Sequence, residues 1–265
     1  MSYEQIELEA RDGVARITMN RPEALNPLSL EMAAEMRSAL EHVAGDPQLR
    51  AVLISGSGRG FCSGAALGGE GERALSPTGR PDVLADLRQF YNPLILAIRE
   101  LPKPVVAAVN GPAAGIGCSL ALACDQVVIA ESAYLLNAFA KIGLTLDGGA
   151  SVFLSARAGH ARASEMAMLA ERVPAARALE WGLVNRVVAD DQLAAEAGAL
   201  AARLAASPTL SYAASKRLLN ASVFGDLAAQ LDREAVEQQR LAESDDFGIG
   251  VLGFLSKQDP EFTGG

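Results

Sequence analysis

The chain has 265 residues, of which 50% are hydrophobic and 21% charged, and this composition predicts a soluble globular protein with ample material for a core. The net charge of −9 argues against nucleic acid and against an anionic membrane surface as the main partner. The first residues lack a basic region followed by an apolar run, and no apolar segment approaches the roughly 18 residues of a membrane span. We therefore expect no secretory signal and no membrane association.

The cysteine pattern points to a reducing compartment. Cys62, Cys118 and Cys124 are an odd number of cysteines, and no two of them form a CxxC pair. Buried, reduced thiols explain this usage better than a disulfide framework or a metal site does. The chain is therefore expected to be cytoplasmic and to bind no metal.

The first half of the chain alternates predicted strands and helices. Residues 6–20 read as two strands joined by a turn at Asp12–Gly13. Ser29 is placed to cap a helix over 30–45, whose apolar residues recur at helical spacing. Further short strands are predicted at 51–57, 104–110 and 126–130. This alternation predicts ββα or βα units, with parallel strands covered by helices.

The pattern changes near Pro174. Before that point, residues 68–80 are rich in Gly, Ser and Pro and read as a surface loop. After it, three long segments have helical spacing, and nothing beyond Val188 reads as a strand. We predict an α/β core over residues 1–190 and a C-terminal helical region over residues 191–265.

Two glycine-rich turns each follow a predicted apolar strand. "SGSGRGFCSG" does not complete a dinucleotide fingerprint, and "GPAAGIG" lacks the Lys-Ser/Thr of a phosphate-binding P-loop. If residues 61–66 and 115–117 face each other, two backbone N–H groups converge on one oxygen, and the second also lies at a helix N-terminus. Such a pair would form an oxyanion hole made of backbone, although two tight strand-to-helix connections would produce the same pattern.

The chain resembles the enoyl-CoA hydratase/isomerase (crotonase) family along almost its whole length. Six segments occur in the family's order, and they are "ITMNRPEALNPLS", "FCSGAAL", "LPKPVVAAVNGPAAGIGCSLALACD", "FAKIGLTLDGGAS", "ALEWGLVNRVV" and "VLGFLSKQDPEF". The resemblance implies a crotonase-like spiral of ββα turns over 1–190 that binds acyl-CoA, and a helical trimerisation region over 191–265. It also implies a homotrimer or a dimer of trimers that acts on acyl-CoA thioesters in lipid metabolism, with coenzyme A as part of the substrate and no separate cofactor.

The resemblance carries over to individual residues. The N–H groups of Ala65 and Ile116 match the donors that hold the thioester carbonyl, and a backbone donor tolerates these side chains. The family more often has Asp at the position of Ala66. The residues that match the lining of the CoA and substrate site are Ala24, Leu25, Ser63, Gly64, Ala66, Leu67, Gly115, Phe139 and Lys257.

The acidic residues distinguish between the reactions of the family. Hydratases use two glutamates, and this chain has Ser119 and Phe139 at the matching positions. Asp147 matches the aspartate of isomerase-like members. One carboxylate is sufficient to move a double bond, because it removes a proton from one carbon and returns it to another. The residue chemistry alone also allows Asp147 to be the N-cap of a helix that begins in "DGGASVFLSARAG".

Three hypotheses follow from these residues. The leading one is an enoyl-CoA isomerase with Asp147 as acid and base. The second is a hydratase or related lyase that uses another acid or a bound water. The third is a binding protein that kept the thioester pocket without its chemistry. Hydrolysis by Ser119 is disfavoured, because "GIGCSLA" lacks the G-x-S-x-G pattern of a nucleophile elbow.

Overall fold

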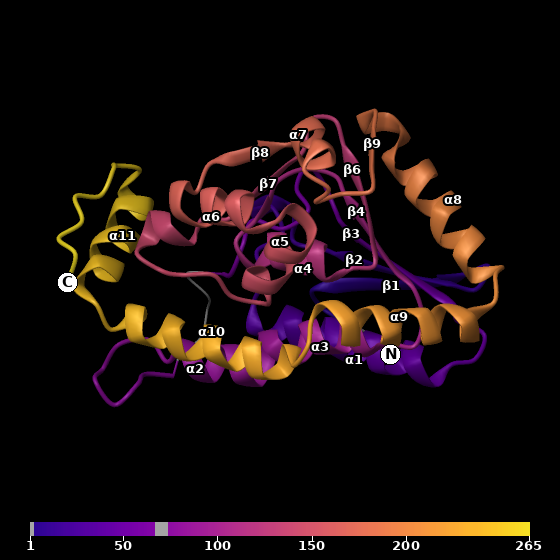
Figure 1. The fold of residues 1–265 in the computed structure, drawn as a ribbon, viewed down its shortest axis with the longest axis horizontal. Coiled ribbons are helices and arrows are strands. Elements are labelled where there is room, and N and C mark those ends of the chain that lie inside the picture. The colour runs from indigo at the N-terminus through magenta and orange to yellow at the C-terminus, as the bar shows by residue number, and fades with distance from the viewer. Residues whose placement is uncertain (1–2, 67–73) are drawn as a thin grey trace.

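A six-stranded sheet lies at the centre of the computed structural model, which describes residues 3–66 and 74–265 (Figure 1). Its strand order is β1-β2-β3-β4-β6-β9, and only the β1–β2 pair is antiparallel. The strands of this sheet are β1 (Ile6–Arg11), β2 (Val14–Met19), β3 (Ala51–Gly56), β4 (Val105–Val109), β6 (Gln126–Ala130) and β9 (Arg186–Val188). β4 is buried along its whole length, as expected of a parallel strand covered on both faces.

The predicted local elements of the first half are confirmed. Asp12 and Gly13 both have positive φ angles, which the two-residue turn of the β1–β2 hairpin requires. The Oγ of Ser29 accepts a hydrogen bond from the N–H of Met32 at 3.0 Å and so begins α1 (Leu30–Gly45) as predicted. β9, which ends at Val188, is the last strand in the part of the chain that the structure describes.

A second, three-stranded sheet is a feature that the sequence patterns did not predict. It has the order β5-β7-β8, with β5 (Ala113–Ala114), β7 (Tyr134–Leu136) and β8 (Arg172–Pro174). Strands of two or three residues are too short for alternation to be recognised. This small sheet matters for function because β5 leads directly into the second glycine-rich turn.

Helices cover the sheet and continue to the C-terminus. The long C-terminal helices remain close to the core: α8 (Leu193–Ala205) packs on β2, β3, β4 and β6, while α10 (Leu227–Ala242) runs beside α2 (Val83–Asp86) and α3 (Asn92–Glu100) (Figure 1). The helices between β3 and β9 are α2 (Val83–Asp86), α3 (Asn92–Glu100), α4 (Ile116–Ala123), α5 (Ala150–Ala158), α6 (His160–Leu169) and α7 (Ala175–Glu180). Those that follow are α8 (Leu193–Ala205), α9 (Thr209–Val223), α10 (Leu227–Ala242) and α11 (Asp245–Ser256).

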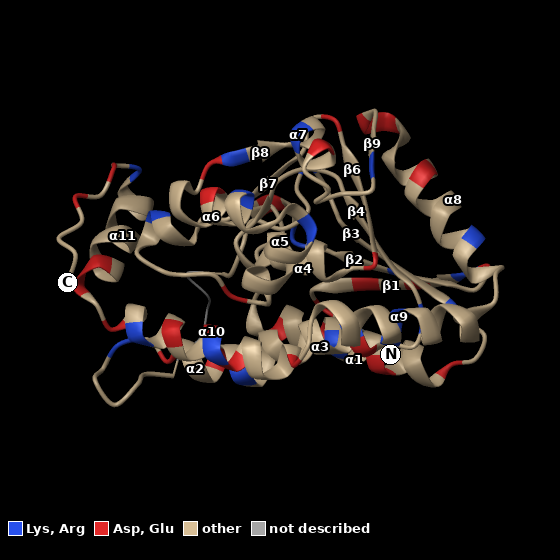
Figure 2. Ribbon diagram, in the orientation of Figure 1, with Lys and Arg blue, Asp and Glu red and all other residues tan. Residues whose placement is uncertain are grey.

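Most charged side chains lie on the outside of the fold. Figure 2 shows acidic and basic residues dispersed over the outer helices, whereas α4 carries none and all of its residues are buried. The three cysteines are buried and unbridged, as predicted, and burial raises the pKa of the Cys118 thiol to about 12. Among the described residues, no helix is both long enough and apolar enough to cross a membrane.

A buried ion pair attaches α9 to the core. The Nζ of Lys216 donates to the Oδ2 of Asp125 at 2.8 Å and to the main-chain oxygen of Ile98 at 2.7 Å. The other carboxylate oxygen of Asp125 accepts from Arg99 at 3.0 Å. α9 is therefore held by a cation whose partners come from α3 and from the start of β6, and removal of that cation would leave buried acceptors unpaired.

We expect Lys216→Met to lower the free energy of unfolding by about 2 kcal/mol, because it removes hydrogen bonds from a charged donor to buried acceptors. Urea denaturation at fixed protein concentration measures this change. The matched control is Arg217→Met, which removes an exposed cation from the next position of the same helix and should change stability little. Equal stability of the two variants would contradict the anchoring role.

Candidate functional site

The first glycine-rich turn begins where β3 ends and is stabilised by a buried asparagine. The side-chain amide of Asn26 donates to the main-chain oxygens of Ser57 at 2.9 Å and Gly60 at 2.7 Å. Its oxygen accepts from the N–H of Arg21 at 2.8 Å, so all three contacts tie neighbouring loops together. A Cβ at Gly56 would lie 2.5 Å from the main-chain oxygen of Phe61, so only glycine allows this close return of the chain.

The segment that follows this turn leaves the N–H of Ala65 unpaired. Leu28 forms main-chain hydrogen bonds with the residues on either side of Ala65. Its N–H donates to the oxygen of Gly64 at 2.8 Å, and its oxygen accepts from the N–H of Ala66 at 3.1 Å. In an extended chain, the N–H groups of successive residues point to opposite sides. The N–H of Ala65 therefore points away from Leu28, and no described residue accepts a hydrogen bond from it.

The second glycine-rich turn joins β5 to α4. Gly115 adopts φ 51° and ψ −127°, a conformation that a residue with a Cβ rarely tolerates. α4 then begins at Ile116, whose N–H is one of the unpaired donors at a helix N-terminus. No described residue accepts from this N–H, and the partial positive charge of the helix start favours an anion beside it.

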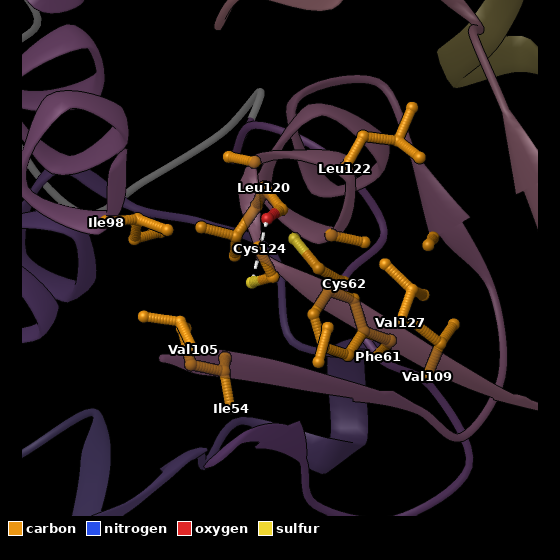
Figure 3. Packing of buried hydrophobic residues seen from close by; sticks show 14 of the residues in the cluster. Ile54, Phe61, Cys62, Ile98, Val105, Val109, Leu120, Leu122, Cys124 and Val127 are labelled. Carbon is orange, nitrogen blue, oxygen red and sulfur yellow. Dashed lines mark hydrogen bonds between the residues drawn. The ribbon is translucent and has the colours of Figure 1, made fainter. Parts of the chain in front are cut away.

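The two turns are in direct contact. Cys62 pairs with Ala113, and a Cβ at Gly117 would lie 2.6 Å from the main-chain oxygen of Cys62. Figure 3 shows Phe61 and Cys62 among the core side chains of β4 and β6, which anchor the first turn. The Cα of Gly64 lies 3.9 Å from where a Cβ of Gly115 would stand. The tertiary structure thus brings the predicted segments 61–66 and 115–117 face to face.

The segment that carries Asp147 lies against the first turn of α4. A Cβ at Gly148 would overlap the Cδ1 of Ile116 and would lie 3.0 Å from the Cβ of Ser119. The hydroxyl of Ser119 donates to the main-chain oxygen of Asp147 at 2.8 Å. Ser119, at the position of a family glutamate, therefore fastens the Asp147 segment to the helix of the second turn.

The carboxylate of Asp147 is buried and only half paired. Its Oδ2 accepts from the Nε2 of Gln238 at 2.9 Å, whereas Oδ1 is buried and has no partner among the described residues. Burial, and then the nearby carboxylate of Glu234, raise the pKa of Asp147 well above its ordinary value, while the hydrogen bond from Gln238 opposes this rise. A buried acid with an unpaired oxygen and a raised pKa is suited to accept and return a proton.

The alternative interpretation of Asp147 as a helix N-cap is wrong. α5 has Gly149 at its N-cap position, and the N–H groups of Gly149 and Ser151 donate to Glu234 of α10 at 2.7 and 3.0 Å. The N–H groups at a helix start normally donate to the side chain of the N-cap residue. Here they donate to the carboxylate of Glu234 instead. This arrangement leaves the Asp147 carboxylate available for other contacts.

The residues predicted to line the CoA and substrate site occupy three places. Ala24, Leu25 and Ser63 lie together, because the N–H of Ser63 donates to the oxygen of Leu25 and its hydroxyl to that of Ala24, at 3.0 and 3.2 Å. The ring of Phe139 lies beside Gly115, at 3.7 Å from where a Cβ of Gly115 would stand. Lys257 is exposed at the C-cap of α11, and Leu67 lies outside the described residues. The CoA-binding roles of all these residues remain predictions.

Three buried polar residues near the site were missed by the sequence analysis. Glu234 and Gln238 reach Asp147 and its neighbours from α10, far away in sequence. Asn137 is 1% exposed and follows β7, whose last residue accepts from the N–H of Gly115, and its side-chain amide has no partner among the described residues. The helical periodicity of α10 does indicate a buried face, and polar residues on that face are the one signal that could have identified the pair.

The geometry defines the chemistry available at this site. Two unpaired N–H groups on adjoining backbones can stabilise an oxygen that gains negative charge, and the carboxylate of Asp147 on the neighbouring segment can move a proton. Ser119 and Phe139, which the family resemblance matches to two glutamates of hydratases, supply no second carboxylate at these positions. The arrangement therefore suits a reaction that needs an oxyanion hole and one acid–base group.

Comparison with known proteins identifies the family of this chain. The model of the family described as "Enoyl-CoA hydratase/isomerase" matches residues 9–265. The chain is 43% identical over 253 residues to the 1,2-epoxyphenylacetyl-CoA isomerase of Escherichia coli K12, with 95% of each chain covered. It is 42% identical over 264 residues to a probable enoyl-CoA hydratase of Rhodobacter capsulatus, with 100% of each covered.

A solved structure of an enoyl-CoA hydratase has the same fold as this chain. The crystal structure of an enoyl-CoA hydratase from Mycobacterium avium subsp. paratuberculosis superposes with a TM-score of 0.89 at 40% identity, over 99% of this chain and 100% of that one. The mixed α/β core with its C-terminal helices is thus the crotonase fold, as predicted. The chain belongs to the enoyl-CoA hydratase/isomerase family, whose members act on acyl-CoA thioesters.

Proposed function

We propose that this enzyme moves a carbon–carbon double bond in an enoyl-CoA, with Asp147 as the acid–base group and with the N–H groups of Ala65 and Ile116 as the oxyanion hole. The observation that carries the proposal is the Asp147 carboxylate, which is buried and has one oxygen held by Gln238 and the other unpaired among the described residues. The name of the E. coli relative, 1,2-epoxyphenylacetyl-CoA isomerase, supports isomerisation of an acyl-CoA as the general class of reaction.

The reaction from a 3-enoyl-CoA balances with these groups alone. Oδ1 of Asp147 takes a proton from C2, and the electron pair of that C–H bond moves into the thioester carbonyl to form a dienolate. The N–H groups of Ala65 and Ile116 donate to the dienolate oxygen. Asp147 then returns the proton to C4, which leaves the double bond between C2 and C3. The proposed reaction needs no separate cofactor, because coenzyme A enters as part of the substrate.

Hydration is less well supported by the side chains at the site. Addition of water needs a group that activates the water and a group that protonates the carbon, and hydratases of this family use two glutamates. Ser119 donates its hydroxyl to the main chain of Asp147, and Phe139 has no ionisable group. Neither residue can act as a general base near neutral pH.

The remaining features of the proposal concern binding and assembly. Lys257 is proposed to contact the phosphates of CoA, consistent with its exposure and charge. Assembly as a trimer or a dimer of trimers is supported by large apolar side chains exposed on the C-terminal helices, namely Leu210, Leu218, Leu219, Leu252, Phe254 and Leu255. Cytoplasmic location stays a prediction from cysteine usage.

Asp147→Asn should lower kcat for 3-enoyl-CoA isomerisation by at least about 100-fold, because it removes the acid–base group and keeps the shape of the side chain. The dissociation constant for a CoA ester, measured by calorimetry, should change little. Asp191→Asn, at an exposed aspartate, is the control and should retain wild-type turnover. The assay should include crotonyl-CoA and 1,2-epoxyphenylacetyl-CoA. Wild-type isomerisation by Asp147→Asn would refute the proposal, and efficient hydration of crotonyl-CoA by the wild type would favour a hydratase.

Ala65→Pro should lower kcat/KM by about 100- to 1,000-fold, because proline has no N–H with which to stabilise the dienolate oxygen. Steady-state kinetics with a 3-enoyl-CoA measure the change, and circular dichroism checks that the variant is folded. Ala65→Gly retains the N–H and is the matched control, so its turnover should stay close to that of the wild type. A folded Ala65→Pro variant with full activity would exclude this donor.

Asp147→Asn should also make the protein more stable than the wild type at pH values above the folded-state pKa of Asp147. A carboxyl whose pKa is raised by folding binds more protons in the folded chain than in the unfolded chain, so stability is lost as the pH rises through the folded pKa. The uncharged amide of the variant has no such loss. Thermal melting over a pH series should therefore show a stability difference that grows with pH and nearly vanishes at acidic pH. A constant difference would mean that Asp147 titrates normally.

A further inference from the structure

Both N–H hydrogens of the Gln238 side-chain amide are donated to residues 145 and 147. Gln238 is fully buried on α10, and its Nε2 donates to the main-chain oxygen of Thr145 at 2.7 Å and to the Oδ2 of Asp147 at 2.9 Å. Its Oε1 accepts from the N–H of Thr145 at 3.4 Å. A flipped amide would place an oxygen against two acceptors and an NH₂ group against a donor, so the contacts with Thr145 determine that an N–H faces Asp147.

This orientation determines which oxygen of Asp147 carries a proton. An N–H group can donate but cannot accept, so a proton on Oδ2 would oppose the N–H of Gln238. Oδ1, in contrast, is buried with no partner among the described residues. When the carboxyl is neutral, the proton therefore lies on Oδ1. This is the oxygen that remains available to a substrate.

Glu234 lies one helical turn before Gln238, on the same face of α10. Its carboxylate accepts hydrogen bonds from the N–H groups of Gly149 and Ser151 at the start of α5. These donors are therefore paired, and the Asp147 carboxylate does not cap the helix. The charge of Glu234 also opposes ionisation of Asp147. From α4, the neighbouring side chain is the uncharged Ser119, which bonds to the main chain of Asp147. α10 thus supplies the charged and polar side chains that control this carboxyl among the described residues.

We propose that Gln238 is a positioning residue that confines the exchangeable proton of Asp147 to Oδ1, so that one oxygen both takes the proton from the substrate and returns it. This inference rests on the proposed function, because it assigns Asp147 as the base. It gives α10 of the C-terminal helical region a role in the reaction itself. In Figure 1, α10 lies along α2 and α3. From α10, the side chain of Gln238 hydrogen-bonds to Asp147 in the loop before α5.

Gln238→Met tests the inference, because it keeps an unbranched side chain of similar length and removes the donor. We expect kcat to fall by about 10- to 100-fold, as for other residues that orient a catalytic group, with a much smaller change in KM. Loss of the N–H also removes an interaction that lowers the pKa of Asp147. The acidic limb of the kcat/KM pH profile should therefore move to higher pH.

The matched control is Gln239→Met at the next position of α10. The side chain of Gln239 also bonds to main-chain groups, accepting from Leu84 at 3.0 Å and donating to Pro81 at 3.3 Å, but it does not contact Asp147. A loss of helix packing alone would affect both variants, whereas a shift of the pH profile should appear only in Gln238→Met. The same shift in both variants would overturn the inference.

A second variant tests the inference if Gln238→Met does not fold, and a second measurement tests it without relying on turnover. Gln238→Glu preserves the length of the side chain and replaces the donor with an ionisable acceptor, so the acidic limb should again move to higher pH. Infrared difference spectra of wild type against Asp147→Asn report the protonated carboxyl directly, and its titration should shift in the Gln238 variants. If Asp147→Asn is inactive but the Gln238 variants keep the wild-type pH profile and carboxyl titration, the positioning role is wrong and the proposed function stands. If Asp147→Asn remains active, the proposed function is wrong, and the positioning role of Gln238, which rests on it, is wrong as well.

Discussion

The close approach of two backbone turns is the constraint on which the rest of this site depends. Gly117 lies so near Cys62 that a Cβ would stand 2.6 Å from the main-chain oxygen of that residue. Only at this separation do the turns that carry Ala65 and Ile116 present their N–H groups on adjoining backbones. The buried side chains of Phe61 and Cys62 hold the first turn in the core, and the small β5-β7-β8 sheet holds the second. An oxyanion hole built this way needs no particular side chain at either donor, so Ala and Ile are compatible with it.

The same close packing extends from the turns to the acid. Gly148 fits against Ile116 because it has no side chain, and Ser119 bonds to the main chain of Asp147. A glutamate at position 119 would add a second carboxylate to this region, whereas the serine present links α4 to the main chain of Asp147. The side chain at position 119 thus contributes to the placement of Asp147.

Burial of a carboxylate opposes stability, and the fold limits this effect without removing it. Glu234 satisfies the start of α5, Gln238 satisfies one oxygen of Asp147, and the second oxygen remains unpaired among the described residues. A fully paired carboxylate would be more stable and would have a lower pKa, but it would be a poorer acceptor for a substrate proton. The incomplete pairing of Asp147 is what the proposed role in proton transfer requires.

The sequence by itself determined the hairpin at Asp12–Gly13, the cap at Ser29, the helices and long strands, and, through family resemblance, the fold. It also supplied the candidates for the reacting residues, whose roles stay predictions. These features depend on neighbours in the chain, whose spacing and turn chemistry can be read directly. Only the tertiary structure decided the meeting of the two turns, the second sheet and the state of Asp147. The residue pair Gln238 and Asp147 is separated by 91 positions, and that between Glu234 and Gly149 by 85. Whether a carboxylate caps a helix or carries a proton depends on such distant partners and on burial, which no local pattern encodes.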